Sequence, residues 1–151
     1  MIKIGDEAPD FILKDHNGQK IQLSSLKGEN VLLSFHPLAW TKVCAEQMKS
    51  LEETVDIFED LNTIALGMSV DTVPSKKAWA DYLGIKKTKL LSDFWPHGEV
   101  AKQYSVFRNE DGFSERAAIL IDQQGKVILA KVYPISQLPD IEEIVRALKE
   151  Q

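Results

Sequence analysis

The sequence predicts an α/β fold in which helices cover a central mixed β-sheet. Short apolar runs typical of buried strands alternate along the chain with amphipathic stretches typical of helices. Turn signals near both ends of the chain also predict antiparallel strand pairs beside the alternating part. The chain has 151 residues, 44% of them hydrophobic, which suits a single domain spanning residues 1–151.

The N-terminal part predicts an edge hairpin followed by a central strand. Residues 11–23, FILKDHNGQKIQL, place short strand-like stretches around Asn17 and Gly18, a pair that tolerates the positive φ values of a tight turn. Residues 30–37, NVLLSFHP, form a nearly continuous apolar run that ends at Pro37. Such a run is typical of a strand covered on both faces, and proline ends it because proline lacks an N–H donor.

The middle of the chain alternates between predicted helices and strands. From Thr41 to about Asn62, apolar residues recur every three or four positions opposite acidic residues, which predicts one amphipathic helix. The run TIALGMSV (63–70) then predicts a strand. PSKKAWADYLGI (74–85) predicts a helix begun by proline and closed by glycine, and TKLLSDF (88–94) predicts a short strand.

The last third of the chain completes the pattern. GEVAKQYSVF (98–107) predicts a short helix, and ERAAILID (115–122) and KVILAKVY (126–133) predict two strands around a glutamine–glycine turn. LPDIEEIVRALKE (138–150) predicts a C-terminal amphipathic helix. A hairpin, a β-α-β-α-β run, an antiparallel pair and a closing helix together predict a thioredoxin-like fold.

Composition narrows the classes of function. The net charge is -5 and both signs are interspersed, which argues against nucleic acid or an anionic membrane as the main partner. The N-terminus, MIKIGDEAPDF, has acidic residues where a secretory signal needs an apolar run, and no stretch approaches the roughly 18 apolar residues of a membrane span. We therefore expect a cytoplasmic protein.

The one cysteine of the chain, Cys44, lies in the first turn of the helix predicted to start near Thr41, on the same face as Met48. Unpaired N–H groups at a helix start carry partial positive charge, which favours the thiolate, the reactive form. A free cysteine is also commonly an inert buried residue, and a threonine at this point is a favourable N-cap without catalytic meaning. Position alone leaves both interpretations open.

A longer pattern distinguishes them. Pro37, Thr41 and Cys44 follow the spacing P-x-x-x-T/S-x-x-C, and this stretch resembles the active-site motif of peroxiredoxins. RAAILID (116–122) resembles the strand that carries the distal active-site arginine of that family, and IGDEAPDFIL (4–13) looks like its N-terminal hairpin. The resemblance thus spans nearly the whole chain.

The subclass is also indicated by a resemblance. LLSDFWPHGEVAKQYSVF (90–107) is similar to the corresponding stretch of the one-cysteine class named for alkyl hydroperoxide reductase E. Two residues depart from the family pattern, since His36 replaces the usual aromatic residue before the proline and Trp40 replaces the commoner phenylalanine. We expect these departures to affect the shape of the pocket and the substrate preference.

The resemblance implies an antioxidant thiol peroxidase and assigns roles to five residues. Cys44 would attack a peroxide oxygen and become a sulfenic acid. Thr41 would hold the peroxide, Arg116 would stabilise the thiolate and the charge on the leaving oxygen, and Pro37 would shield the sulfur from water. Gln47, three residues after the cysteine, would orient the arginine.

Partners follow from the same resemblance and from the cysteine count. With one cysteine, the chain has no internal disulfide, so an external thiol must reduce the sulfenic acid. A low-molecular-weight thiol, a glutaredoxin-like protein and thioredoxin are the candidates. The resemblance also implies a homodimer, and no metal or cofactor is expected.

Other interpretations stay open at this point. The cysteine could serve a peroxide sensor or a chaperone-type binding module without fast turnover, whereas general thiol–disulfide exchange is disfavoured by the missing second cysteine. His16, His36 and His97 could be imagined around a metal, but they lack the spacing of metal ligands. Without the resemblance, Arg108 and Arg146 would be equal candidates for the arginine of the site.

Overall fold

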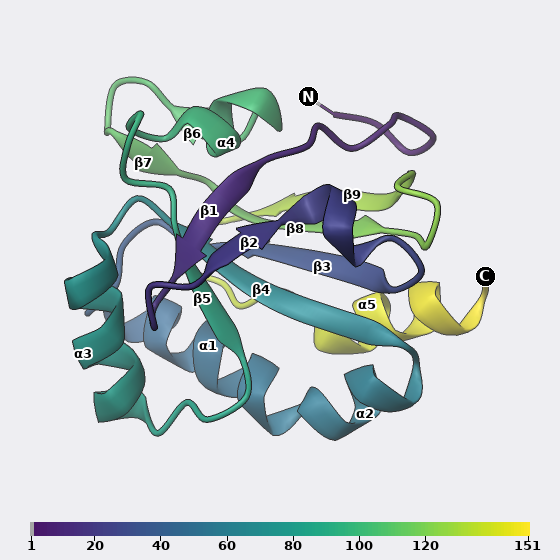
Figure 1. Ribbon diagram of the computed structural model, residues 1–151, viewed down its shortest axis with the longest axis horizontal. Coiled ribbons are helices and arrows are strands. Elements are labelled where there is room, and N and C mark those ends of the chain that lie inside the picture. Colours follow the sequence, from purple (N-terminus) through teal and green to yellow (C-terminus); the bar gives the residue numbers. More distant parts are fainter. Residues whose placement is uncertain (1) are drawn as a thin grey trace.

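Figure 1 shows the fold in a computed structural model, which describes residues 2–151. Its centre is a mixed seven-stranded sheet with the strand order β2-β1-β5-β4-β3-β8-β9. The strands are β1 (Ile12–Asp15), β2 (Lys20–Gln22), β3 (Asn30–Phe35), β4 (Thr63–Ser69), β5 (Lys89–Ser92), β8 (Arg116–Ile121) and β9 (Val127–Tyr133). Strands β3, β4 and β5 are parallel, and the other neighbouring pairs are antiparallel. The predicted mixed sheet is therefore confirmed.

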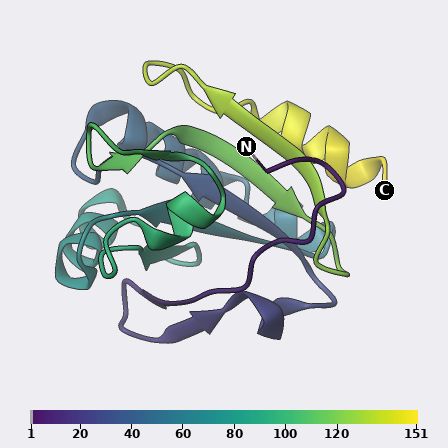
Figure 2. The same ribbon diagram turned by 90° about the horizontal axis from the view of Figure 1, so that it is seen from above.

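Helices lie on both faces of this sheet (Figure 1). The lower face in that view packs against α1 (Lys42–Glu53), α2 (Val55–Asp60), α3 (Val73–Leu83) and α5 (Ile141–Lys149). The upper face packs against α4 (Glu99–Gln103) and the short 3-10 helix η1 (Leu23–Leu26). Seen from above in Figure 2, the N-terminal hairpin lies at one edge of the sheet and β9 at the opposite edge.

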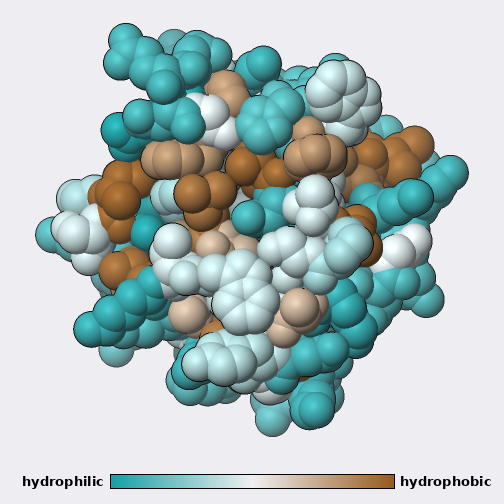
Figure 3. Space-filling view, turned by 90° about the vertical axis from the view of Figure 1, so that its left-hand side faces the viewer, coloured by the Kyte–Doolittle hydropathy of each residue, from teal (hydrophilic) through white to brown (hydrophobic). Residues whose placement is uncertain are grey.

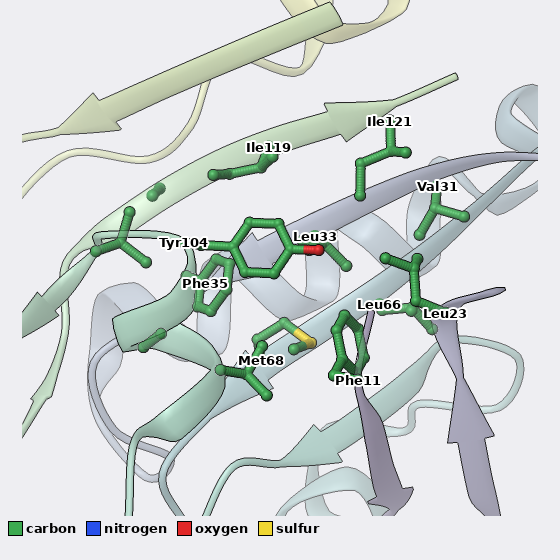
Figure 4. Packing of buried hydrophobic residues seen from close by; sticks show 14 of the residues in the cluster. Phe11, Leu23, Val31, Leu33, Phe35, Leu66, Met68, Tyr104, Ile119 and Ile121 are labelled. Atoms are coloured by element: carbon green, nitrogen blue, oxygen red, sulfur yellow. The ribbon is translucent and has the colours of Figure 1, made fainter. Parts of the chain in front are cut away.

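Strand β3 shows how one sequence supplies two cores. All six of its residues are buried, and alternate side chains point to opposite faces of the sheet. Val31, Leu33 and Phe35 join the upper core, whereas Leu32 joins the lower one. In Figure 4 the ring of Tyr104 lies among the upper-core side chains, and its hydroxyl donates to the Pro9 carbonyl at 2.6 Å.

Helix α1 packs closely on the sheet at Gly67 of β4. A Cβ atom at this position would lie 2.5 Å from Met48 Sδ and 2.8 Å from a methyl group of Leu90. These distances are shorter than normal van der Waals contact, so a side chain here would have to displace the side chains of Met48 and Leu90. The missing side chain therefore lets Met48 of α1 pack directly on β4.

The helix predicted from Thr41 to Asn62 is wrong in one respect, because the structure divides it into α1 and α2. The break is at Thr54, whose backbone leaves the helical region at φ -98° and ψ 1°. The Thr54 hydroxyl donates to the Ser50 carbonyl at 2.7 Å, and its N–H is shared between the carbonyls of Ser50 and Leu51. Threonine hydroxyls compete for helix carbonyls in this way and bend or end helices.

The remaining predicted elements are present with small shifts. Helix α3 begins at Val73, where the Thr72 hydroxyl accepts from the Ser75 N–H, and it closes at Gly84 with φ 75°. Three elements were not predicted: η1 and the small hairpin of β6 (Phe107–Arg108) and β7 (Phe113–Ser114). Within residues 2–151, every helix is too short or too polar to cross a membrane.

Candidate active site

One end of the lower sheet face carries polar side chains instead of apolar ones. On β3, Ser34 lies two residues after Leu32 and so points to the same face as that core residue. On β8, Arg116 lies two residues before the core residue Ala118 and so points to the same face. Ala118 pairs with Ser34 across the sheet. The sheet thus presents a hydroxyl and a guanidinium towards the first turns of α1.

Cys44 meets these groups from the helix side. Its side chain lies in the first turn of α1 and is 1% exposed. Arg116, 72 residues later in the chain, places Nη1 at 3.3 Å from Cys44 Sγ. The thiol predicted to lie on the inward face of the helix is therefore in contact with a buried cation, which favours the thiolate.

The guanidinium of Arg116 is held by two further contacts. Nη1 also donates to Gln47 Oε1 at 2.7 Å, and Nε donates to the Ile135 carbonyl at 2.9 Å. The residue is only 2% exposed, so these hydrogen bonds replace the water that a guanidinium would otherwise bind. The predicted arginine therefore has a fixed orientation towards the sulfur.

Gln47 connects the arginine to the sheet. Its Nε2 donates to Ser34 Oγ at 2.7 Å and to the Phe35 carbonyl at 3.1 Å. Both donors of the side-chain amide are used in this way, so Oε1 is left to accept from Arg116. The orienting role expected for Gln47 has the geometry it needs.

The loop between β3 and α1 is fixed by hydrogen bonds to its neighbours. Pro37 is buried at its start, and the Ala39 N–H donates to Asp71 Oδ2 at 2.8 Å. Trp40 has a left-handed backbone with φ 67°, and its Nε1 donates to Ser75 Oγ at 3.2 Å. A non-glycine residue keeps such a conformation only where its surroundings impose it, so this loop is held in place by α3 and by the segment before it.

Thr41 is the N-cap residue of α1, but its side chain does not make the capping hydrogen bond expected of a threonine there. It occupies the N-cap position and its carbonyl accepts the first helical bond from Ala45, but its hydroxyl forms no capping bond. That hydroxyl donates instead to the Leu38 carbonyl at 2.8 Å. Thr41 is exposed and lies one turn before the cysteine, where its oxygen is free to accept from a ligand.

His36 lies deep in the site between two cations. Burial lowers the pKa of His36 well below its usual value, and the nearby charges of Lys76 and Arg116 lower it further. The hydrogen bond to the Ser34 carbonyl counteracts part of this effect. The imidazole is therefore neutral.

The other arginines and histidines lie elsewhere. Arg108 is on the surface, where Nε bonds Asp111 at 2.6 Å and Nη1 approaches Glu115 at 3.4 Å. His16 Nδ1 accepts from the Leu90 N–H, and His97 Nε2 lies 2.7 Å from the Gly112 carbonyl. No group of three metal-binding side chains is arranged for a metal within residues 2–151.

Sequence reasoning missed the polar groups that support the named residues. These are the Ser34 hydroxyl, the Ile135 carbonyl and the Asp71 carboxylate. The period-two alternation of β3 could have indicated Ser34, because it places a hydroxyl on the lower face beside the helix. Ile135 and Asp71 act from loops, which carry no such periodic signal.

Comparisons with known proteins bear on this site. The model of the AhpC/TSA family matches residues 4–130. Alkyl hydroperoxide reductase E of Mycobacterium tuberculosis is 38% identical over 141 residues, covering 93% of this chain and 92% of that protein. The chain belongs to the peroxiredoxin family. The predicted thiol peroxidase class, and the resemblance to alkyl hydroperoxide reductase E, are thereby confirmed.

Other peroxiredoxins extend the comparison to structure. Peroxiredoxin 2 of Thermoplasma acidophilum is 32% identical, covering 97% of this chain and 74% of that protein. The crystal structure of reduced Plasmodium vivax 2-Cys peroxiredoxin aligns with a TM-score of 0.90 at 30% identity, over 99% of this chain and 81% of that one. Peroxidoxin BcpB of Mycobacterium tuberculosis aligns with a TM-score of 0.87 at 26% identity, over 99% of this chain and 98% of that one. These neighbours confirm the thioredoxin-like fold.

Replacement of Gln47 by leucine tests the support of the peroxiredoxin arginine. Gln47→Leu leaves Ser34, the Phe35 carbonyl and Arg116 each without one buried partner. We expect the free energy of unfolding in urea to fall by about 1–3 kcal/mol. Lys49→Leu, on the exposed face of the same helix, is the control and should change it by less than about 0.5 kcal/mol. Equal effects of the two variants would contradict the assigned support.

Proposed function

We propose that this peroxiredoxin reduces hydrogen peroxide and organic hydroperoxides through a sulfenic acid formed on Cys44. The single observation that supports this most strongly is the Arg116 Nη1 atom, 3.3 Å from Cys44 Sγ and held by Gln47 at 2.7 Å. A buried thiol that only packs needs no charged donor. A thiol that reacts as a thiolate and then displaces an anionic peroxide oxygen needs a charged donor held in a fixed position.

In the oxidation step, sulfur bonds to one peroxide oxygen and displaces the other. The Cys44 thiolate attacks the nearer oxygen, so an S–O bond forms as the O–O bond breaks. The sulfur is oxidised to a sulfenic acid and the peroxide is reduced. The leaving oxygen departs with the electron pair of the broken bond, takes up a proton and leaves as water or an alcohol.

Fixed donors around the sulfur would serve this step. Arg116 would stabilise first the thiolate and then the charge that grows on the leaving oxygen, without reorganisation of water. Thr41, exposed at the start of α1, would hold the peroxide through its hydroxyl. Pro37, buried at the end of β3, would exclude water and so strengthen these electrostatic interactions.

The sulfenic acid would be reduced from outside the chain. One thiol forms a mixed disulfide with Cys44 and releases water, and a second thiol attacks that disulfide to free the cysteine. We propose a low-molecular-weight thiol as the main reductant, with a glutaredoxin-like protein or thioredoxin as alternatives. The 1% exposure of Cys44 supports a small attacking molecule.

We place this antioxidant activity in the cytoplasm, as a proposal that rests on cysteine use. The thiol of Cys44 is free, and the glutathione and thioredoxin systems of that compartment keep thiols reduced. The same systems would supply the reductants proposed for the sulfenic acid.

Catalytic turnover tests the proposed function directly. We expect the protein to consume many equivalents of hydrogen peroxide when a thiol such as glutathione or coupled glutaredoxin is supplied, and Cys44→Ser to consume none. A sulfenic acid probe with mass spectrometry should label Cys44 before the thiol is added. One equivalent of peroxide consumed without further turnover, under every thiol tried, would instead support a sensor and overturn the enzyme proposal.

The Thr41 hydroxyl is tested by an isosteric variant. Thr41→Val removes the hydroxyl and keeps the volume, so we expect oxidation of Cys44 by hydrogen peroxide to slow by about 100-fold. Alkylation of the same sulfur by iodoacetamide should stay near the parent rate, because the thiolate itself is unchanged. Thr41→Ser is the control that retains the hydroxyl. Parent-like peroxide kinetics in the valine variant would mean that Thr41 is structural only.

We further propose a homodimer formed through an aromatic surface made of Trp40, Tyr82, Phe94 and Trp95. Trp95 and Tyr82 are 80% and 78% exposed, and the rings of Trp40 and Tyr82 contact each other at a tilt of 43° with centroids 5.6 Å apart. Figure 3 shows the side of the molecule on which α3 lies, with apolar and pale side chains gathered across its middle and hydrophilic ones around them. Clustered exposed aromatic residues are typical of protein interfaces.

Sedimentation velocity at low micromolar concentration tests the dimer. We expect the parent to sediment as a dimer and Trp95→Asp to shift it to a monomer, because a carboxylate cannot be buried unpaired in an apolar contact. Ile57→Asp is the control, since Ile57 is also exposed but lies on α2. A monomeric parent would contradict the dimer, and dissociation by both variants would contradict the surface chosen.

A further inference from the structure

Lys76 is a buried cation that the proposed chemistry does not yet use. It lies on α3, faces the lower core and is 0% exposed. Its Nζ donates to Ser69 Oγ at 2.6 Å and lies 3.4 Å from His36 Nε2. No carboxylate touches it directly among the described residues. Burial of an ammonium group on neutral partners is costly, so its presence needs an explanation.

The contact with His36 connects Lys76 to the start of the loop that runs from β3 to α1. His36 directly precedes Pro37, and its Nδ1 lies 3.4 Å from the Ser34 carbonyl. We assign the hydrogen to Nδ1, which leaves Nε2 as the acceptor for Lys76. Register supports this place in the site: Phe35 pairs with Met68 of β4 and with Ala117 of β8. The next residue, His36, therefore lies between Ser69 and Arg116.

The contact with Ser69 connects Lys76 to a later part of the same loop, at Ala39. Ser69 Oγ accepts from Lys76 and donates to Asp71 Oδ2 at 2.7 Å. The same carboxylate oxygen accepts from the Ala39 N–H at 2.8 Å. Lys76 is thus connected to the loop directly at His36 and indirectly, through Ser69 and Asp71, at Ala39. The loop continues into Thr41 and the first turn of α1, which carries Cys44.

We infer that Lys76 is a positioning residue of the peroxidase site, which holds the 36–41 loop through His36 and through the Ser69–Asp71 pair and adds a second buried positive charge. This inference rests on the proposed function. The thiolate and the leaving oxygen both gain from a nearby cation that water does not screen. Arg116 supplies one such cation from β8 and Lys76 supplies the other from α3.

The charge on Lys76 changes close to neutral pH. Burial lowers the pKa of Lys76 to about 7, and the negative charges of Asp71, Cys44 and Asp93 counteract part of this effect. The neutral His36 faces it from the end of β3. Below about pH 7 the lysine is charged and supports the thiolate, and above that pH the support is lost. The rate per thiolate should therefore fall as the pH rises through this value.

Replacement of Lys76 by methionine separates positioning from packing. Lys76→Met keeps the length of the side chain and removes the charge, so we expect a folded protein at least as stable in urea as the parent. Oxidation of Cys44 by hydrogen peroxide at pH 6 should be about tenfold slower. The fall in rate per thiolate near pH 7 should vanish. Lys77→Met, the exposed neighbour on the same helix, should match the parent.

Serine 69 provides an independent variant. Ser69→Ala cuts the route to Asp71 while keeping the lysine, so peroxide oxidation should slow by about threefold with the pH-dependent fall retained. The double variant with Lys76→Met should be no slower than Lys76→Met alone, because both act through one network. If Lys76→Met does not fold, Ser69→Ala still decides, since parent-like kinetics in that variant would overturn the positioning role.

The outcomes for Lys76 and for the proposed function are distinct. A parent-like rate and pH profile in Lys76→Met would reject the role of Lys76 while catalytic turnover by the parent stands. Absence of turnover by the parent would reject the peroxidase proposal. In that case the rate of the single oxidation of Cys44, compared between the parent and Lys76→Met, would still test the role of the lysine.

Discussion

The contact between the Arg116 guanidinium and Cys44 is the interaction on which the rest of the site depends, because it joins strand β8 to helix α1. A buried guanidinium needs protein acceptors in place of the water it loses. Gln47 and the Ile135 carbonyl provide those acceptors, and Ser34 in turn fixes Gln47. The helix cannot rotate or rise without breaking this series, and Gly67 beneath α1 allows the close approach that the series requires.

The site is therefore a small cluster of polar side chains set into the lower core. These side chains come from the ends of β3 and β8, the first turns of α1 and the buried side of α3. Low dielectric surroundings make each charge inside it count for more than it would in water, both in favour of a thiolate and against an unpaired group. Reactivity and burial thus have the same cause, which is the exclusion of water from around the sulfur.

Much of this fold could be predicted from the sequence, because strong periodic signals dominate it. The alternation of β3, the turn at Asn17 and Gly18, and the glycine that closes α3 all appear where local chemistry requires them. The break at Thr54 could not be predicted, because it depends on which carbonyl a hydroxyl selects.

The site was predictable to a different degree. Cys44, Thr41 and Pro37 follow a short spacing, but Arg116 was chosen by resemblance alone, since contacts 72 residues apart leave no local pattern. Lys76 gave no signal at all, because a lysine in an amphipathic helix is ordinarily solvated. Its burial became visible only once the folded chain placed it against His36 and Ser69.

The single cysteine has a kinetic consequence for a cell that makes this protein. Because Cys44 has no partner thiol in the chain, oxidation and reduction are separate encounters with separate molecules. At steady state the oxidised fraction equals the pseudo-first-order rate constant of oxidation divided by the sum of the rate constants of oxidation and reduction, so it follows the ratio of peroxide to reductant. Where reductant is abundant the chain removes peroxide as fast as it arrives. Where reductant is scarce the oxidised form accumulates, and its abundance reports the redox balance of its surroundings.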